Sequence, residues 1–460
     1  MRPTRWRRST HVAIGVAVIV LVAALVGVAA MVTGQPSGDA VSAAPRPAPV
    51  AARPGVVPVD ISAPIPTLRG LSVALAPLLA DPDLGALTGR VTDAETGEAL
   101  WELNADAPMQ PASVNKVLTT AAALYTLPRD ARLTTTVVAS ADEPGLVVLK
   151  GGGDTTLSAA PAGTDTWYKG AARISDLADQ VRQSGVSVTR VEVDTSAYTG
   201  PTMAPGWDPA DIEGGDIAPM ESVMLDGGRI QPTTVESRRS TTPALDAGRA
   251  LATALRVDPA QVAVVPSSAS GGREIAKVQS APLLERLRQM MNESDNVMAE
   301  STAREVAEQL NRPQSFSGGV SAVLGQLRSA GVDTRAAKLV DSSGLSVDDR
   351  LTARLLDDVV TTAAGNTEPA MRPLVDLLPI AGGSGTLSNR YTDTPDGRAA
   401  AGWLRAKTGS LTGTNALAGI VTDDSGRVLT FALISNNAGP TGRTAIDGVA
   451  AVLRSCGCAS

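Results

Sequence analysis

The sequence predicts an α+β fold in which an antiparallel sheet is flanked by helices and a mixed α/β region interrupts the chain. A hairpin-like stretch over residues 87–103 and several strand-like stretches near the C-terminus predict the sheet. Apolar residues at helical spacing over residues 114–125 and 283–310 predict the flanking helices. With 460 residues, the chain has room for two or three domains.

The N-terminal segment, residues 1–33, predicts an exported protein. Residues 12–32 are uncharged and mostly apolar, and they follow four basic residues, Arg2, Arg5, Arg7 and Arg8. The segment is either an uncleaved membrane anchor or a signal peptide cleaved near the small residues 40–44. In both cases we expect the rest of the chain to lie outside the cytoplasm, in the cell envelope. Residues 34–67 are rich in proline and alanine and predict an extended linker.

The composition excludes several classes of site. The net charge is −7 and no basic cluster follows the first eight residues, so nucleic acid is not an expected partner. The only histidine is His11, at the edge of the N-terminal apolar segment, which excludes a Ser-His-Asp triad or a histidine-ligated zinc site elsewhere. Cys456 and Cys458 can pair with each other, pair between chains or stay free. We expect no metal and no cofactor, and the oligomeric state stays open.

The globular part is expected to begin near residue 68, with the hairpin of residues 87–103 around the turn at 93–97. A helix over residues 114–125 follows, so Ser113 is predicted at its N-terminus, with Lys116 one turn further on the same face. A serine nucleophile and a lysine base would then be neighbours, and the N–H groups of the helix end favour a developing negative charge. Alternatively, Ser113 is only a helix cap and Lys116 a solvated residue.

Residues 131–275 are rich in valine, threonine and glycine and lie between residues 68–130 and 276–460. The resemblance described below implies that they form one inserted domain, which divides a catalytic domain into those two parts. Strands are expected at residues 134–139, 145–150 and 186–193, with a helix at 171–184. Residues 201–228, rich in proline, glycine and aspartate, predict a long ordered loop that reaches back to the catalytic domain.

Two more polar motifs follow the insertion. Ser294-Asp295-Asn296 lies inside or between the helical segments of residues 283–310, where it would also suit a plain helix cap. Strands are expected at residues 399–411, 416–421 and 428–434, and the first contains Lys407-Thr408-Gly409. Gly409 would leave room for close approach by a ligand backbone, while Lys407 has the alternative role of an edge-strand lysine that discourages aggregation.

Read together, Ser113-x-x-Lys116, Ser294-Asp295-Asn296 and Lys407-Thr408-Gly409 resemble the S-x-x-K, S-D-N and K-T-G signature of penicillin-binding proteins. Further landmarks, such as Pro205-Gly206-Trp207 and residues 341–346, extend the likeness over roughly residues 70–435. The chain resembles the D-alanyl-D-alanine carboxypeptidase/endopeptidase family, the class C low-molecular-mass penicillin-binding proteins. It departs from the family at Ser342, where glycine is more usual, and we expect a local packing adjustment there.

The resemblance implies a penicillin-binding/β-lactamase-like serine peptidase fold and a penicillin-sensitive enzyme that acts on peptidoglycan stem peptides and binds β-lactams. It implies that Ser113 is the nucleophile, that Lys116 is the base, with its pKa lowered by burial and by Lys407, and that Ser294 relays a proton. The residues implied in substrate binding are Asn296, Lys407, Thr408, Gly409, Ser410 and Thr412, with an oxyanion hole from the N–H groups of Ser113 and Ser410.

Three alternatives remain at the level of the sequence. A β-lactamase would need a deacylating glutamate after the S-D-N motif, whereas Glu102-Leu103-Asn104 precedes Ser113. The others are an inactive penicillin-binding scaffold and a solute-binding protein. The intact Ser113, Lys116 and Lys407 argue against a scaffold. The sequence leaves open the balance between carboxypeptidase and endopeptidase activity.

Overall fold

The computed structural model describes residues 61–265 and 272–456. The chain divides into two units, Met1–Pro58 and Val59–Ser460, and the second is described here. The apolar segment at residues 12–32, most of the predicted linker and Cys458 lie outside the described residues. Cys456 is disulfide-bonded. Within residues 61–265 and 272–456, no helix has both the length and the apolar character needed to cross a membrane.

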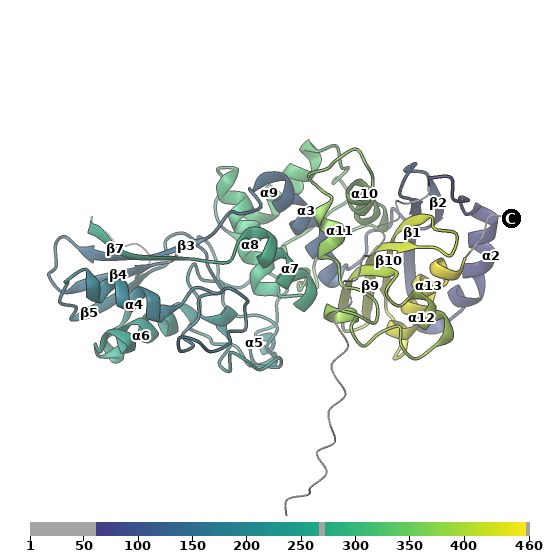
Figure 1. The fold of residues 1–460 in the computed structure, drawn as a ribbon. Helices are drawn as coiled ribbons and strands as arrows, with labels where there is room; N and C mark the ends of the chain where they lie inside the picture. Colours follow the sequence, from purple (N-terminus) through teal and green to yellow (C-terminus); the bar gives the residue numbers. More distant parts are fainter. Residues whose placement is uncertain (1–60, 266–271, 457–460) are drawn as a thin grey trace, which may run out of the picture. The chain divides into compact units, whose positions relative to one another are not determined.

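The first sheet is antiparallel, with strand order β2-β1-β10-β9-β8 (Figure 1). Its strands are β1 (Ala86–Asp93), β2 (Ala99–Leu103), β8 (Leu404–Leu411), β9 (Thr414–Thr422) and β10 (Val428–Asn436). The predicted hairpin and C-terminal strands are confirmed, except that residues 399–403 are not part of β8. There, Thr394 caps the short helix α12 (Pro395–Ala400), and Gly402 turns the chain into β8 with a φ of +79°.

Helices cover both faces of this sheet, because its strands carry apolar residues on both faces. Leu429, Phe431 and Leu433 of β10 belong to one core with α2 (Leu68–Leu79) and α13 (Gly442–Ser455). Ala432 and Ile434 of the same strand belong to the other core. The helices of that core are α3 (Lys116–Thr126), α7 (Leu283–Glu293), α8 (Asn296–Gln309), α9 (Phe316–Ser329), α10 (Ala353–Ala364) and α11 (Pro373–Leu377).

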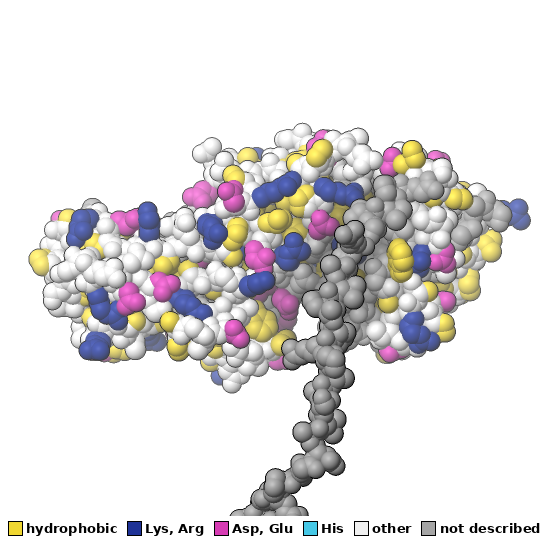
Figure 2. Space-filling view, in the orientation of Figure 1, with side chains coloured by type: hydrophobic (Ala, Val, Ile, Leu, Met, Phe, Trp, Pro, Cys, Tyr) yellow, Lys and Arg dark blue, Asp and Glu magenta, His cyan; other side chains and the backbone are white. Residues whose placement is uncertain are grey.

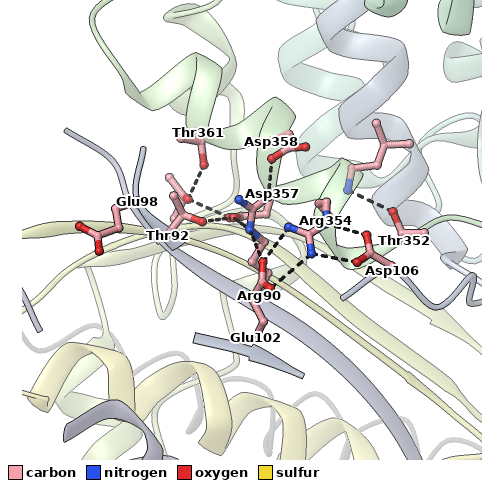
Figure 3. Close-up of polar contacts among 12 residues, drawn as sticks. Arg90, Thr92, Glu98, Glu102, Asp106, Thr352, Arg354, Asp357, Asp358 and Thr361 are labelled. Atoms are coloured by element: carbon pink, nitrogen blue, oxygen red, sulfur yellow. Dashed lines mark hydrogen bonds and ion pairs between the residues drawn. The ribbon is translucent and has the colours of Figure 1, made fainter. Parts of the chain in front are cut away.

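Helix α10 also meets β1 and β10 through a polar cluster (Figure 3). Asp357 of α10 is fully buried and accepts hydrogen bonds from Thr92 and, at 2.8 Å, from Thr430. Arg90 pairs with Asp358 of the next helical position, and with Glu102 at 3.1 Å. Burial raises the pKa of Asp357 to about 7, so this helix is attached to the sheet through a titratable group.

The second sheet is mixed, with strand order β6-β5-β4-β3-β7. Its strands are β3 (Thr134–Ser140), β4 (Leu146–Lys150), β5 (Arg190–Asp194), β6 (Ala263–Val265) and β7 (Gly272–Gln279). Helices α4 (Ile174–Gln183) and α6 (Pro243–Leu255) pack on it (Figure 1). The predicted strand at 186–193 starts only at Arg190, because its parallel partner β4 starts at Leu146, opposite Arg190. The predicted fold class, including this mixed sheet, is confirmed.

Residues 201–228 form an ordered loop that contains the short helix α5 (Ala210–Gly214) and the 3-10 turn η3 (Asp226–Gly228). As predicted, the loop reaches back to segments near the first sheet: the Trp207 indole donates to Asp341 Oδ2 at 2.7 Å, and Ser346 Oγ donates to the Pro205 carbonyl at 2.7 Å. On the face drawn in Figure 2, basic and acidic side chains are intermixed, and neither sign forms a continuous patch there.

Candidate active site

Ser113 lies in a 3-10 turn, η2 (Ala112–Asn115), immediately before α3. The sequence predicted a helix from residue 114, whereas the regular α-helix starts at Lys116 because Ala112 enters the turn with a φ of +50°. The two side chains are in contact as predicted, since Lys116 Nζ lies 2.9 Å from Ser113 Oγ. The hydroxyl therefore has a nitrogen partner one turn away.

Lys116 is fully buried, so it is not the solvated helix residue of the alternative interpretation. Besides Ser113, its Nζ contacts Asn296 Oδ1 at 2.6 Å and the Ser343 carbonyl at 2.8 Å. Burial lowers the pKa of Lys116 to about 8, and the carboxylates of Asp341, Asp295, Glu300 and Asp216 oppose that shift. Burial and the neighbouring Lys116 also lower the pKa of Lys407.

The S-D-N motif forms the turn between α7 and α8. Ser294 ends α7 in the left-handed conformation with a φ of +56°, and Asp295 caps α8 by accepting a hydrogen bond from the Met298 N–H at 2.9 Å. Asn296 begins α8 and donates to the Asp216 carbonyl at 3.0 Å. The motif is thus a helix cap, but its two outer side chains also contact the buried lysines.

Lys407 lies on β8, which is the last strand of its sheet, yet its side chain is fully buried. The interpretation as an edge lysine that discourages aggregation is therefore wrong. Its Nζ donates to Ser294 Oγ at 2.9 Å and to the Thr408 carbonyl at 2.8 Å. Thr408 Oγ1 in turn donates to Thr386 Oγ1 at 2.8 Å. Lys407 and Lys116 thus contact neighbouring residues of the same turn.

Gly409 has a different neighbour from the one that the sequence suggested. A Cβ at this position would lie 2.7 Å from the Pro111 carbonyl oxygen and 3.1 Å from the Ala112 Cβ. The space beside Gly409 is therefore occupied by the turn that carries Ser113. Glycine lets β8 and this turn pack closely, which brings Ser410 near the nucleophile's segment.

One cleft of about 970 Å³ gathers most of the predicted residues. It is lined by Ser113, Ser294, Asn296, Thr408, Ser410 and Thr412. Lys116, Lys407 and Gly409 are not among its lining residues. Two arginines, Arg390 and Arg443, and five acidic residues, Asp208, Asp211, Asp216, Glu236 and Glu293, also line it.

Sequence reasoning missed the polar groups behind Lys116. The Ser343 carbonyl is held by its own loop: Asp341 Oδ1 accepts the N–H groups of Ser343 at 3.0 Å and Gly344 at 2.6 Å. Glu300 of α8 accepts the Ser342 N–H at 2.8 Å. Ser342 is accommodated with its Oγ buried and without a hydrogen-bond partner among the described residues. Residues 341–346 were noticed as a landmark, but a main-chain acceptor has no signature in a sequence.

Glu102, the residue behind the β-lactamase alternative, lies on β2 away from the cleft lining. It pairs with Arg90 at 3.1 Å and with Arg354 at 2.7 Å (Figure 3). Its carboxylate is thus committed to holding β1 and α10. Within residues 61–265 and 272–456, no cluster of His, Cys, Asp and Glu side chains is suited to a metal ion.

Comparison with known proteins places these features in a family. The model of the D-Ala-D-Ala carboxypeptidase 3 (S13) family matches residues 71–239 and 233–455, and that of the "Carboxypeptidase Rv3627c-like, N-terminal domain" matches residues 1–58. Carboxypeptidase DacB of Mycolicibacterium smegmatis is 78% identical over 458 residues, which cover 100% of both chains. Carboxypeptidase Rv3627c of Mycobacterium tuberculosis is 61% identical over 460 residues, again covering 100% of both.

Among solved structures, penicillin binding protein 4 (dacB) from Haemophilus influenzae has a similar fold. The TM-score is 0.67 at 21% sequence identity, and the match covers 84% of this chain and 98% of that one. At this identity the likeness shows the fold.

Proposed function

The chain belongs to the D-Ala-D-Ala carboxypeptidase S13 family and is a serine-type carboxypeptidase, and we propose that it removes the terminal D-alanine of peptidoglycan stem peptides through an acyl-enzyme on Ser113. The observation that carries this proposal is the 2.9 Å contact between Ser113 Oγ and the buried amine of Lys116. A serine hydroxyl is a weak nucleophile until a base accepts its proton. A lysine whose pKa is lowered to about 8 can be that base near neutral pH.

In the proposed acylation step, Lys116 starts as a neutral amine. Its two N–H bonds point to Asn296 Oδ1 and the Ser343 carbonyl, and its lone pair accepts from Ser113. Ser113 Oγ attacks the carbonyl carbon of the penultimate D-alanine while its proton moves to Lys116. The resulting ammonium has three acceptors already in place, so the proton transfer needs little rearrangement.

The groups on β8 are proposed to hold the substrate. The N–H groups of Ser113 and Ser410 would stabilise the negative charge on the tetrahedral oxygen. Thr408 and Thr412 line the cleft, and with Lys407 behind them they suit the terminal carboxylate of the peptide. Ser294, which accepts a hydrogen bond from Lys407, would relay the proton held by Lys116 to the leaving D-alanine amine, so that Lys116 returns to its neutral form. Water then hydrolyses the acyl-enzyme.

The substrate also indicates where the enzyme acts. Peptidoglycan lies outside the cytoplasmic membrane, so the carboxypeptidase acts outside the cytoplasm. We propose that residues 12–32 export the chain and either keep it at the membrane or are removed near residues 40–44.

A fluorescent penicillin tests the proposal directly, because a β-lactam mimics the acyl donor. The purified chain from about Gln35 should form a stable adduct that peptide mass mapping places on Ser113. The Ser113→Ala variant, with unchanged circular dichroism, should form none. In parallel, the wild type should release D-alanine from a pentapeptide ending in D-Ala-D-Ala. Labelling at another residue, or no labelling, would remove Ser113 as the nucleophile.

A further inference from the structure

Asp295, the central residue of the S-D-N motif, does not line the cleft. Its carboxylate is buried, and its partners differ from those of Ser294 and Asn296. Oδ1 accepts the Met298 N–H at 2.9 Å and Oδ2 accepts the Tyr168 hydroxyl at 2.7 Å. Arg229 Nη1 lies 3.5 Å from the same Oδ2. The turn is therefore held by Tyr168 and Arg229, two residues that are distant from it in the sequence.

Tyr168 and Arg229 form one connected unit. Tyr168 lies between β4 and α4 and is buried, and Arg229 directly follows η3. Arg229 donates to the Tyr168 hydroxyl at 3.1 Å, and its guanidinium stacks 4.0 Å above the Trp167 ring. The tyrosine hydroxyl thus accepts from the arginine and donates to Asp295. Neither side chain lines the cleft, so neither meets the substrate there.

The residues on both sides of Asp295 depend on its position. Ser294 has a left-handed backbone, which is strained for serine and persists only when its surroundings fix it. It contacts Lys407, while Asn296, on the other side, contacts Lys116 at 2.6 Å. A rotation of the turn would therefore move the partners of both lysines at once.

We propose that Tyr168 and Arg229 are positioning residues for the reaction: they fix Asp295 so that Ser294 and Asn296 keep their contacts with Lys407 and Lys116. The inference rests on the proposed function of those four residues. It assigns to residues 131–275 a part in catalysis beyond bordering the cleft. A misplacement of about 1 Å in such an arrangement costs on the order of 10²-fold in rate.

Charge supports the same assignment. Burial alone would raise the pKa of Asp295, but Arg229, Arg239, the Met298 N–H and the Tyr168 hydroxyl hold it below its usual value. Asp295 is therefore ionised and raises the pKa of Lys116, as do Asp341, Glu300 and Asp216. Removing the Arg229 cation removes a group that opposes these carboxylates, so the pKa of Lys116 should rise.

The first experiment compares the buried Tyr168 with the partly buried Tyr198. Tyr168→Phe should lower the rate of penicillin acylation and kcat for a D-Ala-D-Ala pentapeptide by about 10- to 100-fold, with little change in KM. Tyr198→Phe is the matched control, because the Tyr198 side chain is partly buried and its hydroxyl donates to the Gly153 carbonyl at 3.3 Å, away from Asp295. Equal rates in the two variants would overturn the positioning role.

The second experiment uses the charge. Arg229→Met should shift the acidic limb of the acylation profile to higher pH and lower its plateau. Arg229→Lys keeps the positive charge, so its profile should lie close to that of the wild type. Arg238→Met is the control, since Arg238 is exposed and pairs with Glu213 at 3.1 Å. An unshifted profile in Arg229→Met would overturn the inference even if Tyr168→Phe failed to fold. A wild type without a label on Ser113 would instead overturn the proposed function.

Discussion

At the scale of single residues, burial gives a reason for lysine at positions 116 and 407, although arginine is the more common cation in this chain. Only six of the 40 Lys and Arg residues are lysine, and two of the six are Lys116 and Lys407. A buried ammonium is costly, so burial favours the neutral amine, a form that arginine does not reach in proteins. The two lysines differ in what they touch: Lys116 contacts the proposed nucleophile, and Lys407 contacts Ser294.

This difference predicts unequal effects of the same substitution. Lys116→Arg keeps the charge but removes the base, so penicillin acylation should fall by about 10²- to 10⁴-fold. Lys407→Arg places a permanently charged group near the proposed site of the substrate carboxylate and should be the milder change. Stopped-flow acylation of both variants, with thermal melts to confirm folding, measures this. Equal losses would show that the division between base and anion-binding lysine is wrong.

The pKa of Lys116 also predicts a pH profile. In the proposed mechanism the neutral amine of Lys116 accepts the proton, and the pKa of Lys116 is lowered to about 8, so the acylation rate should rise with pH up to about 8 and level off above it. Below that value, the protonated lysine cannot accept the Ser113 proton. Acylation rates measured between pH 6 and 9.5 check this. A flat profile across that range would exclude Lys116 as the titrating base.

At the scale of helices and strands, the sequence predicted the parts with a clear period. The hairpin of β1 and β2, strands β9 and β10 and helix α4 lie close to their predicted positions, because apolar residues alternate or recur there. The 3-10 turn at Ser113 was missed, since it depends on Ala112 adopting a positive φ. The start of β5 was missed because register with β4 decides it, and a single sequence does not contain that register.

Helix α10 provides a prediction about stability at this scale. The folded pKa of Asp357 is raised to about 7, above the 3.8 of an ordinary aspartate, so the folded state holds a proton that the unfolded state releases between pH 4 and 7. Stability from this group is therefore lost as pH rises through that window. Asp357→Asn should remove this loss. The Tm of the variant minus that of the wild type should therefore be larger at pH 8 than at pH 5, by on the order of 2 °C.

The control for this helix is Asp358→Asn, which changes the neighbouring, half-exposed partner of Arg90 (Figure 3). Its Tm difference from wild type should vary less with pH, because solvent screens the group. Melts of all three proteins at pH 5 and 8 decide the matter. A Tm difference for Asp357→Asn that is the same at both values would show that Asp357 does not titrate in this range.

At the scale of the whole molecule, the site is built from segments that are distant in the sequence. The motifs predicted which side chains would meet, and the structure brings Ser113, Lys116, Ser294, Asn296 and Lys407 together. The motifs did not predict the Ser343 and Asp216 carbonyls, which are main-chain acceptors that any residue type provides. Nor did they predict Tyr168 and Arg229, which lie far from Asp295 in the sequence and meet it only in the folded chain.

The loop at residues 201–228 contributes acidic side chains to the cleft, since Asp208, Asp211 and Asp216 line it. These carboxylates are candidates to pair with an amine on the stem peptide, which would make the loop a determinant of substrate selectivity. Glu213 instead pairs with Arg238 at 3.1 Å and is not among the lining residues. Glu236, which lies outside this loop, also lines the cleft, and we call these four carboxylates, Asp208, Asp211, Asp216 and Glu236, the acidic wall.

Single alanine substitutions at Asp208, Asp211 and Asp216 should therefore lower kcat/KM for stem peptides with a free side-chain amine. A buried or half-buried ion pair that loses one partner costs binding energy, so we expect a loss of about 5- to 50-fold at the most important position. The same peptides with the amine acetylated should lose much less, because they carry no cation to pair. Glu213→Ala is the matched control and should leave the ratio of the two kcat/KM values unchanged. If all four variants keep the wild-type ratio, the acidic wall does not read the charge of the peptide, and the loop acts on the reaction only through Asn296.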